Sequence, residues 1–141
     1  FQATLNSLPA EVAIFSAAES DYKVKKTSKI KLKKKEKFNL ELEKNVDILN
    51  YVSNHNSLRP KLVVGFAAET NNIKDYARKK LSEKNCDWIV ANDVSNTEIG
   101  FESDFNEVSI FYKNNKYDEL SYKKKSQISD ELVEKIISHL N

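Results

Sequence analysis

Glycine and cysteine are both scarce in this chain of 141 residues, which contains two glycines and a single cysteine, Cys86. One cysteine excludes a disulfide within the chain, and we expect a reducing, cytoplasmic setting. Nucleotide-binding folds commonly place a glycine-rich turn after their first strand, and no such turn occurs in this sequence. We therefore expect either a different fold or a glycine-rich turn that lies upstream of this chain. A dinucleotide-dependent oxidoreductase domain is disfavoured for the same reason.

Long apolar runs and a strong charge of one sign are also missing. No apolar run approaches the ~20 residues that a helix needs to cross a bilayer. The sequence also does not open with a basic stretch followed by an apolar one, which is the pattern of a secretory leader. The two histidines, His55 and His139, lie far apart, and no metal-ligand cluster is evident. With a net charge of +2 and 40% hydrophobic residues, the sequence predicts a soluble protein with one domain, residues 1–141.

Several short apolar runs predict strands. The runs Val12–Ala18, Lys61–Ala67 and Trp88–Ala91 are continuous, which is typical of buried strands. Residues 22–37 are rich in lysine and predict a mobile loop with room for a strand near Ile30 and Leu32. Alternation of apolar and polar residues predicts a half-buried strand at Phe38, Leu40 and Leu42, and another at Val108, Ile110 and Tyr112. A turn at Asn114–Asn115 would join the second of these strands to a last strand, Tyr117–Leu120.

Amphipathic segments separate these strands and predict helices. Phe1–Leu8 has the pattern of a helix that Pro9 stops, and Asp47 can cap a helix that runs to about Ser53. Asn71 or Asn72 can cap a helix whose inner face is formed by Ile73, Tyr76, Ala77 and Leu81. The last helix carries one apolar stripe, formed by Ile128, Leu132, Val133, Ile136, Ile137 and Leu140. The alternation predicts a Rossmann-like α/β fold: a mostly parallel sheet flanked by helices, with a C-terminal antiparallel hairpin.

Small and polar residues follow three of the predicted strands. In open α/β sheets ligands bind outside the carboxyl ends of the strands, so these residues are candidate site residues. Ordinary turns and helix caps would account for any one of the groups equally well, whereas three groups meeting at one edge favour a site. The groups are Ala17–Asp21, Gly65–Thr70 and Asn92–Val94.

Lysines provide two further candidate sites. Lys80 and Lys84 are four residues apart on one helix face, where they could bind phosphates or simply suit the negative end of the helix dipole. The run Lys29–Lys35 contains five lysines and could contact a nucleoside triphosphate, a nucleic acid or only solvent. Nucleic acid is the least favoured partner, because few aromatic residues lie near this run.

Five segments, in this order, resemble the phosphopantothenate–cysteine ligase family. They are Ser16–Tyr22 (SAAESDY), Lys31–Lys34 (KLKK), Gly65–Thr70 (GFAAET), Ile89–Val94 (IVANDV), and Gly100-Phe101 with Ser103, Asp104, Asn106 and Glu107. The resemblance covers nearly the whole chain. It implies an enzyme of coenzyme A biosynthesis that activates the carboxylate of 4′-phosphopantothenate with CTP, releases pyrophosphate, and transfers the acyl group from the acyl-cytidylate to L-cysteine.

The resemblance also implies roles for individual residues. Lys31 is the expected catalytic residue, a lysine on a mobile loop that closes over the site. Ala17 and Ala18 are expected to contact the acid substrate. Mg²⁺ is expected to bind with the triphosphate, and FMN is expected only where a decarboxylase domain is fused upstream. A homodimer is expected to form through the closing strands. The nucleotide is expected to contact Asp21, Lys31, Asn45, Val46, Asp47, Ile48, Phe66, Lys80 and Lys84.

Some positions depart from the family pattern. Glu19 and Ser20 stand where the family usually has valine and alanine, and Val46 replaces the usual proline between Asn45 and Asp47. The family's glycine-rich turn and an Asn-Arg-Ser-Ser-Gly stretch have no counterpart here, so we expect them upstream. An alternative interpretation is therefore a cytidine-nucleotide-binding module without activity of its own, and a third is a nucleic-acid binder that uses the lysine run.

Overall fold

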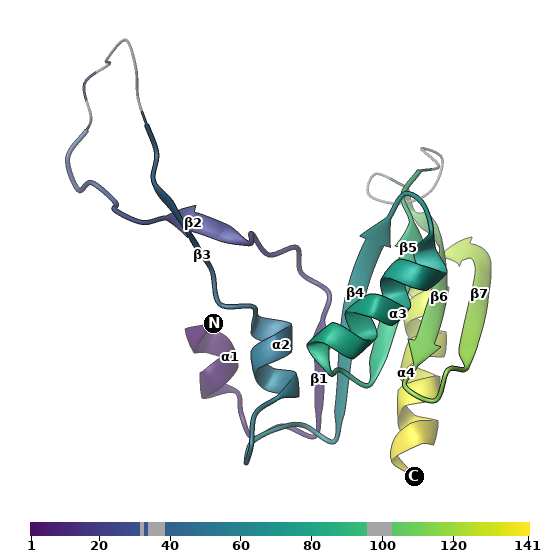
Figure 1. Cartoon of the computed structure of the whole chain (residues 1–141). Coiled ribbons are helices and arrows are strands. Elements are labelled where there is room, and N and C mark those ends of the chain that lie inside the picture. The colour runs from purple at the N-terminus through teal and green to yellow at the C-terminus, as the bar shows by residue number, and fades with distance from the viewer. Residues whose placement is uncertain (32, 34–38, 96–102) are drawn as a thin grey trace.

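The computed structural model of the chain describes residues 1–31, 33, 39–95 and 103–141, and its main element is a five-stranded sheet (Figure 1). The strand order is β1-β4-β5-β6-β7, in which the first three strands are parallel and the last two antiparallel. This confirms the predicted α/β fold with a closing hairpin. The strands are β1 (Val12–Phe15), β4 (Leu62–Glu69), β5 (Trp88–Asp93), β6 (Phe105–Tyr112) and β7 (Tyr117–Lys124).

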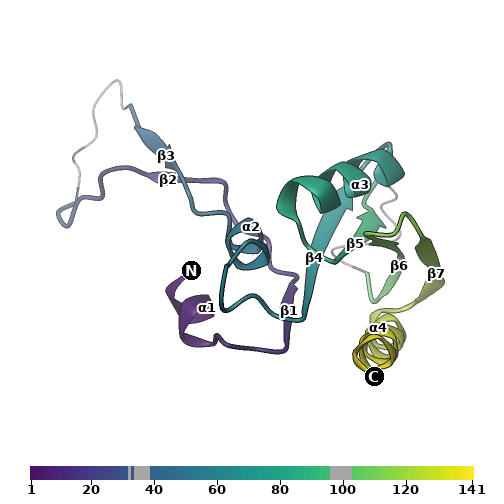
Figure 2. The ribbon, with the colours of Figure 1, turned by 60° about the horizontal axis from the view of Figure 1, so that its bottom comes forward.

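Helices cover both faces of this sheet, with α3 (Ile73–Lys84) on one side and α4 (Lys125–Leu140) on the other (Figure 2). The short helix α2 (Ile48–Ser53) lies on the α3 side, and α1 (Gln2–Asn6) is near the N-terminus. Asp47 caps α2 as predicted, because its carboxylate accepts the N–H of Asn50 at 2.8 Å. Asn72 is the residue that precedes α3, and it adopts a left-handed conformation with φ 45°.

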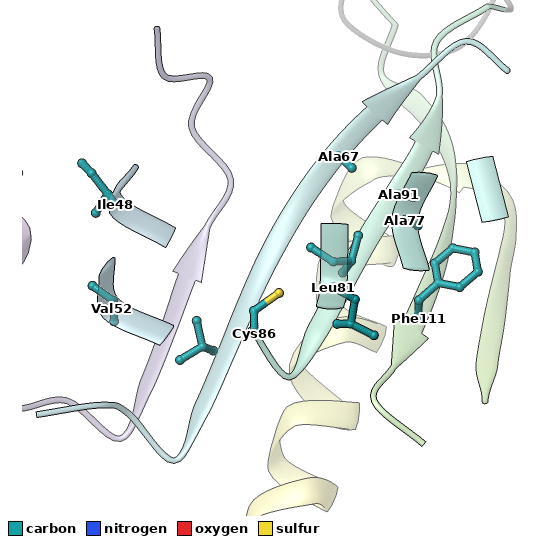
Figure 3. Packing of buried hydrophobic residues seen from close by; sticks show 10 residues of the cluster. Ile48, Val52, Ala67, Ala77, Leu81, Cys86, Ala91 and Phe111 are labelled. Carbon is teal, nitrogen blue, oxygen red and sulfur yellow. The ribbon is translucent and has the colours of Figure 1, made fainter. Parts of the chain in front are cut away.

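Two apolar clusters, one on each face, hold the helices to the sheet. On the α3 side, Ala77 and Leu81 pack with Ile48 and Val52 of α2 against the sheet (Figure 3). On the α4 side, Ile128 and Ile136 are buried against the strands. The central strands β4 and β5 contribute alternate residues to each cluster, which explains why their sequences are continuously apolar.

The first strand differs from its prediction. It ends at Phe15 rather than at Ala18, and it isn't fully buried: Ile14 is 51% exposed. Strand β1 lies at the edge of the sheet, paired only with β4 among the described strands. The apolar run therefore identified a strand correctly, but it could not show that one side of that strand would be open.

The predicted apolar faces of two helices were too broad. Tyr76 is 45% exposed, because the residues that α3 buries are Ala77 and Leu81. On α4, Ile128, Leu132 and Ile136 pack on the sheet, and three residues of the predicted stripe lie beside this contact and are exposed. They are Val133, Ile137 and Leu140.

Strands β2 (Tyr22–Val24) and β3 (Leu42–Lys44) form a separate two-stranded ribbon that extends away from the five-stranded sheet (Figure 1). The two strands pair antiparallel. The predicted half-buried strand was wrong in both place and burial, because Leu40 precedes β3 and both Leu40 and Leu42 are more than half exposed. Ile30 lies outside any strand, while Leu32 and Phe38 lie outside the described residues.

Candidate functional site

A hollow at the carboxyl ends of β1 and β4 gathers most of the predicted nucleotide-binding residues. Phe15, the last residue of β1, pairs with Gly65 within β4, so the loop after β1 lies next to Phe66. Helices α2 and α3 close the other side. The lining residues are Phe15, Ala17, Glu19, Ser20, Asp21, Asn45, Val46, Asp47, Leu49, Phe66, Lys80 and Lys84. We call this space the first hollow.

Asn45 joins the two loops that border the first hollow. Its side-chain amide donates to the carbonyl of Ser20 at 2.7 Å, and its backbone N–H donates to the carbonyl of Asp21 at 2.8 Å. These bonds fix the base of the β2–β3 ribbon, since Asp21 immediately precedes β2 and Asn45 immediately follows β3. The side chain that was predicted to contact the nucleotide therefore also holds the site together.

Two lysines from the C-terminal half of α3, Lys80 and Lys84, line the same space. Lys84 donates to the carboxylate of Asp47 at the start of α2, and the two side chains form an ion pair. Lys80 lies one turn earlier and makes no ion pair with any residue that the structure describes. A positive charge without a carboxylate partner, half-buried at a hollow, suits an anionic ligand.

The pKa of Asp47 reflects the positive charges around the first hollow. Burial acts to raise the pKa of this carboxyl, but the hydrogen bonds from Lys84 and from the N–H of Asn50, together with the charges of Lys84 and Lys80, outweigh it. The pKa of Asp47 is therefore below its ordinary value. The carboxylate stays ionised at neutral pH and keeps Lys84 in place.

Three predicted residues lie elsewhere. Ile48 is 9% exposed and packs in the α3-side core, so its side chain doesn't reach the first hollow. Lys31 is exposed in the segment between β2 and β3 and does not line the first hollow. Ala18 lines a second, adjoining hollow. Their binding roles remain predictions.

Some lining residues were not predicted as contacts. Glu19 and Ser20 line the first hollow; they belong to the strand-end group Ala17–Asp21, but the family resemblance gave them no contact. Phe15 and Leu49 also line it, and periodicity could not single them out because apolar lining resembles apolar core. The position of Glu19 and Ser20 in the loop after the first strand was the available signal.

The three carboxylates that line the first hollow, Glu19, Asp21 and Asp47, are not arranged as a metal site by themselves. Within the part of the chain that the structure describes, no group of three His, Cys, Asp or Glu residues is arranged to hold a metal ion. The described helices also include none that is both long and apolar enough to span a membrane.

Comparison with known proteins decides the family. A model of the DNA/pantothenate metabolism flavoprotein C-terminal domain matches residues 1–140. The chain belongs to this family. The coenzyme A biosynthesis bifunctional protein CoaBC of Haemophilus influenzae is 41% identical over 139 residues, which cover 97% of this chain and 34% of the relative. CoaBC of Bacillus subtilis is 41% identical over 128 residues, 90% of this chain and 31% of the relative.

Solved structures of the family share the fold. A crystal structure of the C-terminal domain of CoaBC superposes with a TM-score of 0.69 at 34% identity, over 92% of this chain and 55% of that chain. The DNA/pantothenate metabolism flavoprotein from Streptococcus pneumoniae gives a TM-score of 0.65 at 26% identity, over 93% of this chain and 62% of that chain. The chain thus spans about a third of the curated relatives and just over half of these solved chains.

Proposed function

We propose that this chain is the nucleotide-binding part of a cytoplasmic phosphopantothenate–cysteine ligase that acts in coenzyme A biosynthesis and uses CTP. The observation that supports this most directly is the first hollow, where residues from four separate segments meet around one space. Two of these segments, the loop after β1 and the segment that contains Phe66, also carry the family resemblance. The two named CoaBC relatives are coenzyme A biosynthesis proteins, at 41% identity.

The proposed reaction has two steps. A carboxylate oxygen of 4′-phosphopantothenate attacks the α-phosphorus of CTP, and pyrophosphate leaves. The amine of L-cysteine then attacks the acyl carbon, an amide bond forms, CMP leaves, and the amine loses a proton. Activation is needed because a carboxylate has no adequate leaving group until its oxygen is attached to phosphorus.

The residues that the family resemblance singled out each have a physical task in this scheme. Lys80 and Lys84 neutralise the triphosphate, with Lys84 exchanging Asp47 for phosphate oxygens. Phe66 provides an apolar wall for the nucleotide. Backbone groups around Asn45 to Ile48 contact the polar edge of cytosine. Lys31 stabilises the negative charge that develops during acyl transfer, after the ribbon segment approaches the site.

Magnesium fits this arrangement as a companion of the nucleotide. Mg²⁺ usually binds one or two carboxylates together with phosphate oxygens. Glu19 and Asp21 line the first hollow, and neither carboxylate forms an ion pair with another described residue. We therefore assign any protein ligands of the ion to these two residues. Bound there, the ion would neutralise phosphate charge.

A second candidate is a nucleotide-binding module that needs further residues for catalysis. The chain spans about a third of the length of its curated relatives, which favours a division of the site between this chain and other segments. We propose that the complete enzyme contains such segments and forms a homodimer. Any decarboxylase with bound FMN would belong to a separate part of the protein.

Pyrophosphate release tests the proposal. In the full-length protein that carries this chain, CTP and phosphopantothenate together should release pyrophosphate, and L-cysteine should then release CMP. ATP in place of CTP should support much slower release. If the full-length protein binds CTP but releases no pyrophosphate with the acid, the binding-module interpretation replaces the ligase. If it doesn't bind CTP either, both are wrong.

A further inference from the structure

A hollow of about 380 Å³ lies between the C-terminal half of α3 and the turn that joins β6 to β7, residues 113–116. It shares no lining residue with the first hollow, and none of its lining residues belongs to a segment that carries the family resemblance. We call this space the turn hollow. The lining residues are Arg78, Leu81, Ser82, Asn85, Lys113 and Asn115.

Helix α3 separates the turn hollow from the first hollow. Arg78 and Ser82 are four residues apart and share one flank of the helix, whereas Lys80 and Lys84 share another. A step of two residues turns an α-helix by roughly 200°, so the two pairs lie on opposite flanks. One helix therefore presents two separate sets of polar side chains, one to each hollow.

The guanidinium group of Arg78 is held in place by two neighbours. Its two terminal nitrogens donate to Asn115, one to the side-chain oxygen at 3.1 Å and the other to the backbone carbonyl at 3.0 Å. The group also lies over the ring of the fully buried Phe111, with its central carbon 5.8 Å from the ring centre. An arginine fixed in this way loses little freedom when it binds a ligand.

The positive charge of Arg78 is not neutralised within the protein. Both of its acceptors on Asn115 are uncharged, and Arg78 forms no ion pair with any carboxylate among the described residues. Lys113 brings a second positive charge, which is only partly offset: it lies 3.5 Å from Asp87, whose carboxylate Arg59 already binds at 2.9 Å. The hollow is therefore positively charged.

The free polar groups of the turn hollow are suited to donate hydrogen bonds. Each terminal nitrogen of Arg78 uses one N–H on Asn115 and keeps another. The side-chain NH₂ of Asn115 and the hydroxyl of Ser82 donate to no residue that the structure describes. No lining residue is a carboxylate. Positive charge together with several N–H and O–H donors is the pattern that binds a phosphate group.

We propose that the turn hollow is a second anion site, which binds the phosphate group of free phosphate or of a small phosphate monoester. Arg78 bonds two of the phosphate oxygens, while Lys113 and Ser82 contact the others. This site does not depend on the proposed function, because its residues lie on the flank of α3 that faces away from the first hollow. It adds a phosphate ligand that is neither the nucleotide nor part of the ligase reaction.

Equilibrium dialysis of the full-length protein against labelled inorganic phosphate tests the site. The wild type should bind phosphate with a Kd on the order of 1 mM, and Arg78→Gln should raise this Kd about ten-fold or more. Lys80→Gln, which alters the first hollow, should retain the binding that depends on Arg78. Displacement by glycerol phosphate at a lower concentration than by unlabelled phosphate would identify a monoester as the ligand, and the reverse order would identify free phosphate.

Lys79→Gln is the matched control, because Lys79 is adjacent to Arg78 but pairs with Glu83 on the exposed side of α3. Asn115→Asp covers the case in which Arg78→Gln does not fold: it keeps the shape of the side chain, places a carboxylate against Arg78 and should abolish the binding. Thermal melting identifies the folded variants. Wild-type phosphate affinity in a folded Arg78→Gln or Asn115→Asp protein overturns the inference. Loss of the same binding in Lys80→Gln would place the phosphate in the first hollow and overturns it too.

Discussion

The ammonium group of Lys84, in the last turn of α3, is bound by the carboxylate of Asp47, the residue that caps α2. This contact joins two helices at the border of the first hollow. The same carboxylate accepts the N–H of Asn50, so one side chain both starts a helix and holds a lysine beside the proposed phosphate position. The lysine is already in place before a nucleotide arrives, which reduces the entropy lost on binding.

Removal of either lysine should weaken nucleotide binding. Lys80→Ala and Lys84→Ala are each expected to raise the Kd for CTP by roughly ten-fold, the value of about one charge-assisted hydrogen bond. Isothermal titration measures this directly. Lys79→Ala is the control, since Lys79 is adjacent to Lys80 but pairs with Glu83 on the exposed side of α3. Unchanged affinity in both site variants would show that these lysines only serve the end of the helix.

Asn45→Ala should affect the first hollow more than the stability of the fold. The substitution removes the bond to the Ser20 carbonyl, worth about 1 kcal/mol, and frees the base of the ribbon. We expect several-fold weaker CTP binding with little change in Tm. Asn56→Ala, at an exposed turn position, should change neither. A loss of stability without a loss of affinity would limit Asn45 to a structural role.

Lys31→Ala should leave folding intact and severely reduce product formation. If Lys31 stabilises charge during acyl transfer, the expected loss in kcat is roughly 100-fold. The measurement is pyrophosphate and amide formation by the full-length protein. Lys29→Ala, two residues away and equally exposed, is the matched control. Wild-type turnover by the Lys31 variant would remove this residue from the mechanism.

Gly65→Ala should destabilise the protein and alter the wall of the first hollow. An added methyl group would lie 2.6 Å from Cδ2 of Leu49 and 2.9 Å from Cδ1 of Ile89. Overpacking of this kind typically costs about 1–3 kcal/mol of folding free energy. The close contact would also displace Leu49, and because Leu49 lines the first hollow, the wall of the hollow would change. Urea denaturation should show the loss, and Leu49→Ala in the same protein should recover part of it. A purely additive double variant would contradict this contact.

Asp118→Asn should produce a difference in stability that depends on pH. Hydrogen bonds from Lys135 at 2.6 Å and from the hydroxyl of Tyr112 at 2.8 Å lower the pKa of Asp118. A carboxyl whose pKa is lower in the folded state stabilises the fold above its unfolded pKa of about 3.9, and that contribution disappears as pH falls through the folded pKa.

For this partly exposed group we expect about 1 kcal/mol at pH 7 after screening by solvent. Denaturation of the wild type and of Asp118→Asn at pH 7 and pH 3 should show the difference shrinking in acid. A constant difference would mean that packing, not ionisation, accounts for it. Lys79→Ala is again a suitable control, because its surface ion pair should contribute little at either pH.

Periodicity predicted the elements best where burial is symmetrical. Strands β4 and β5 are covered on both faces, so a continuous apolar run identifies them and nothing else is needed. Ile14 and Val133 have similar local patterns but are about half exposed. Whether an apolar residue is covered depends on neighbours distant in sequence, which periodicity doesn't contain.

The residues of the first hollow were predicted more from the family resemblance than from the sequence pattern and its physical chemistry. Strand ends and a lysine-bearing helix suggested its position, whereas the inclusion of Asn45 and Asp47 came from the family pattern. The Asp47–Lys84 ion pair joins residues 37 positions apart, and only the packing of α2 against α3 brings them together.

The pairing of β1 with β4 has a consequence for how the chain folds. Residues fifty positions apart, such as Glu11 and Lys61, meet at the start of this pair, and the whole ribbon and α2 lie between them. Bringing the two ends of such a long segment together costs conformational entropy before any contact forms, so this pairing should be slow. The β6–β7 hairpin and α4, whose contacts are local, should therefore assemble earlier. The first hollow needs the end of β1, and its ligand-binding capacity should therefore appear only with the last, rate-limiting phase of folding.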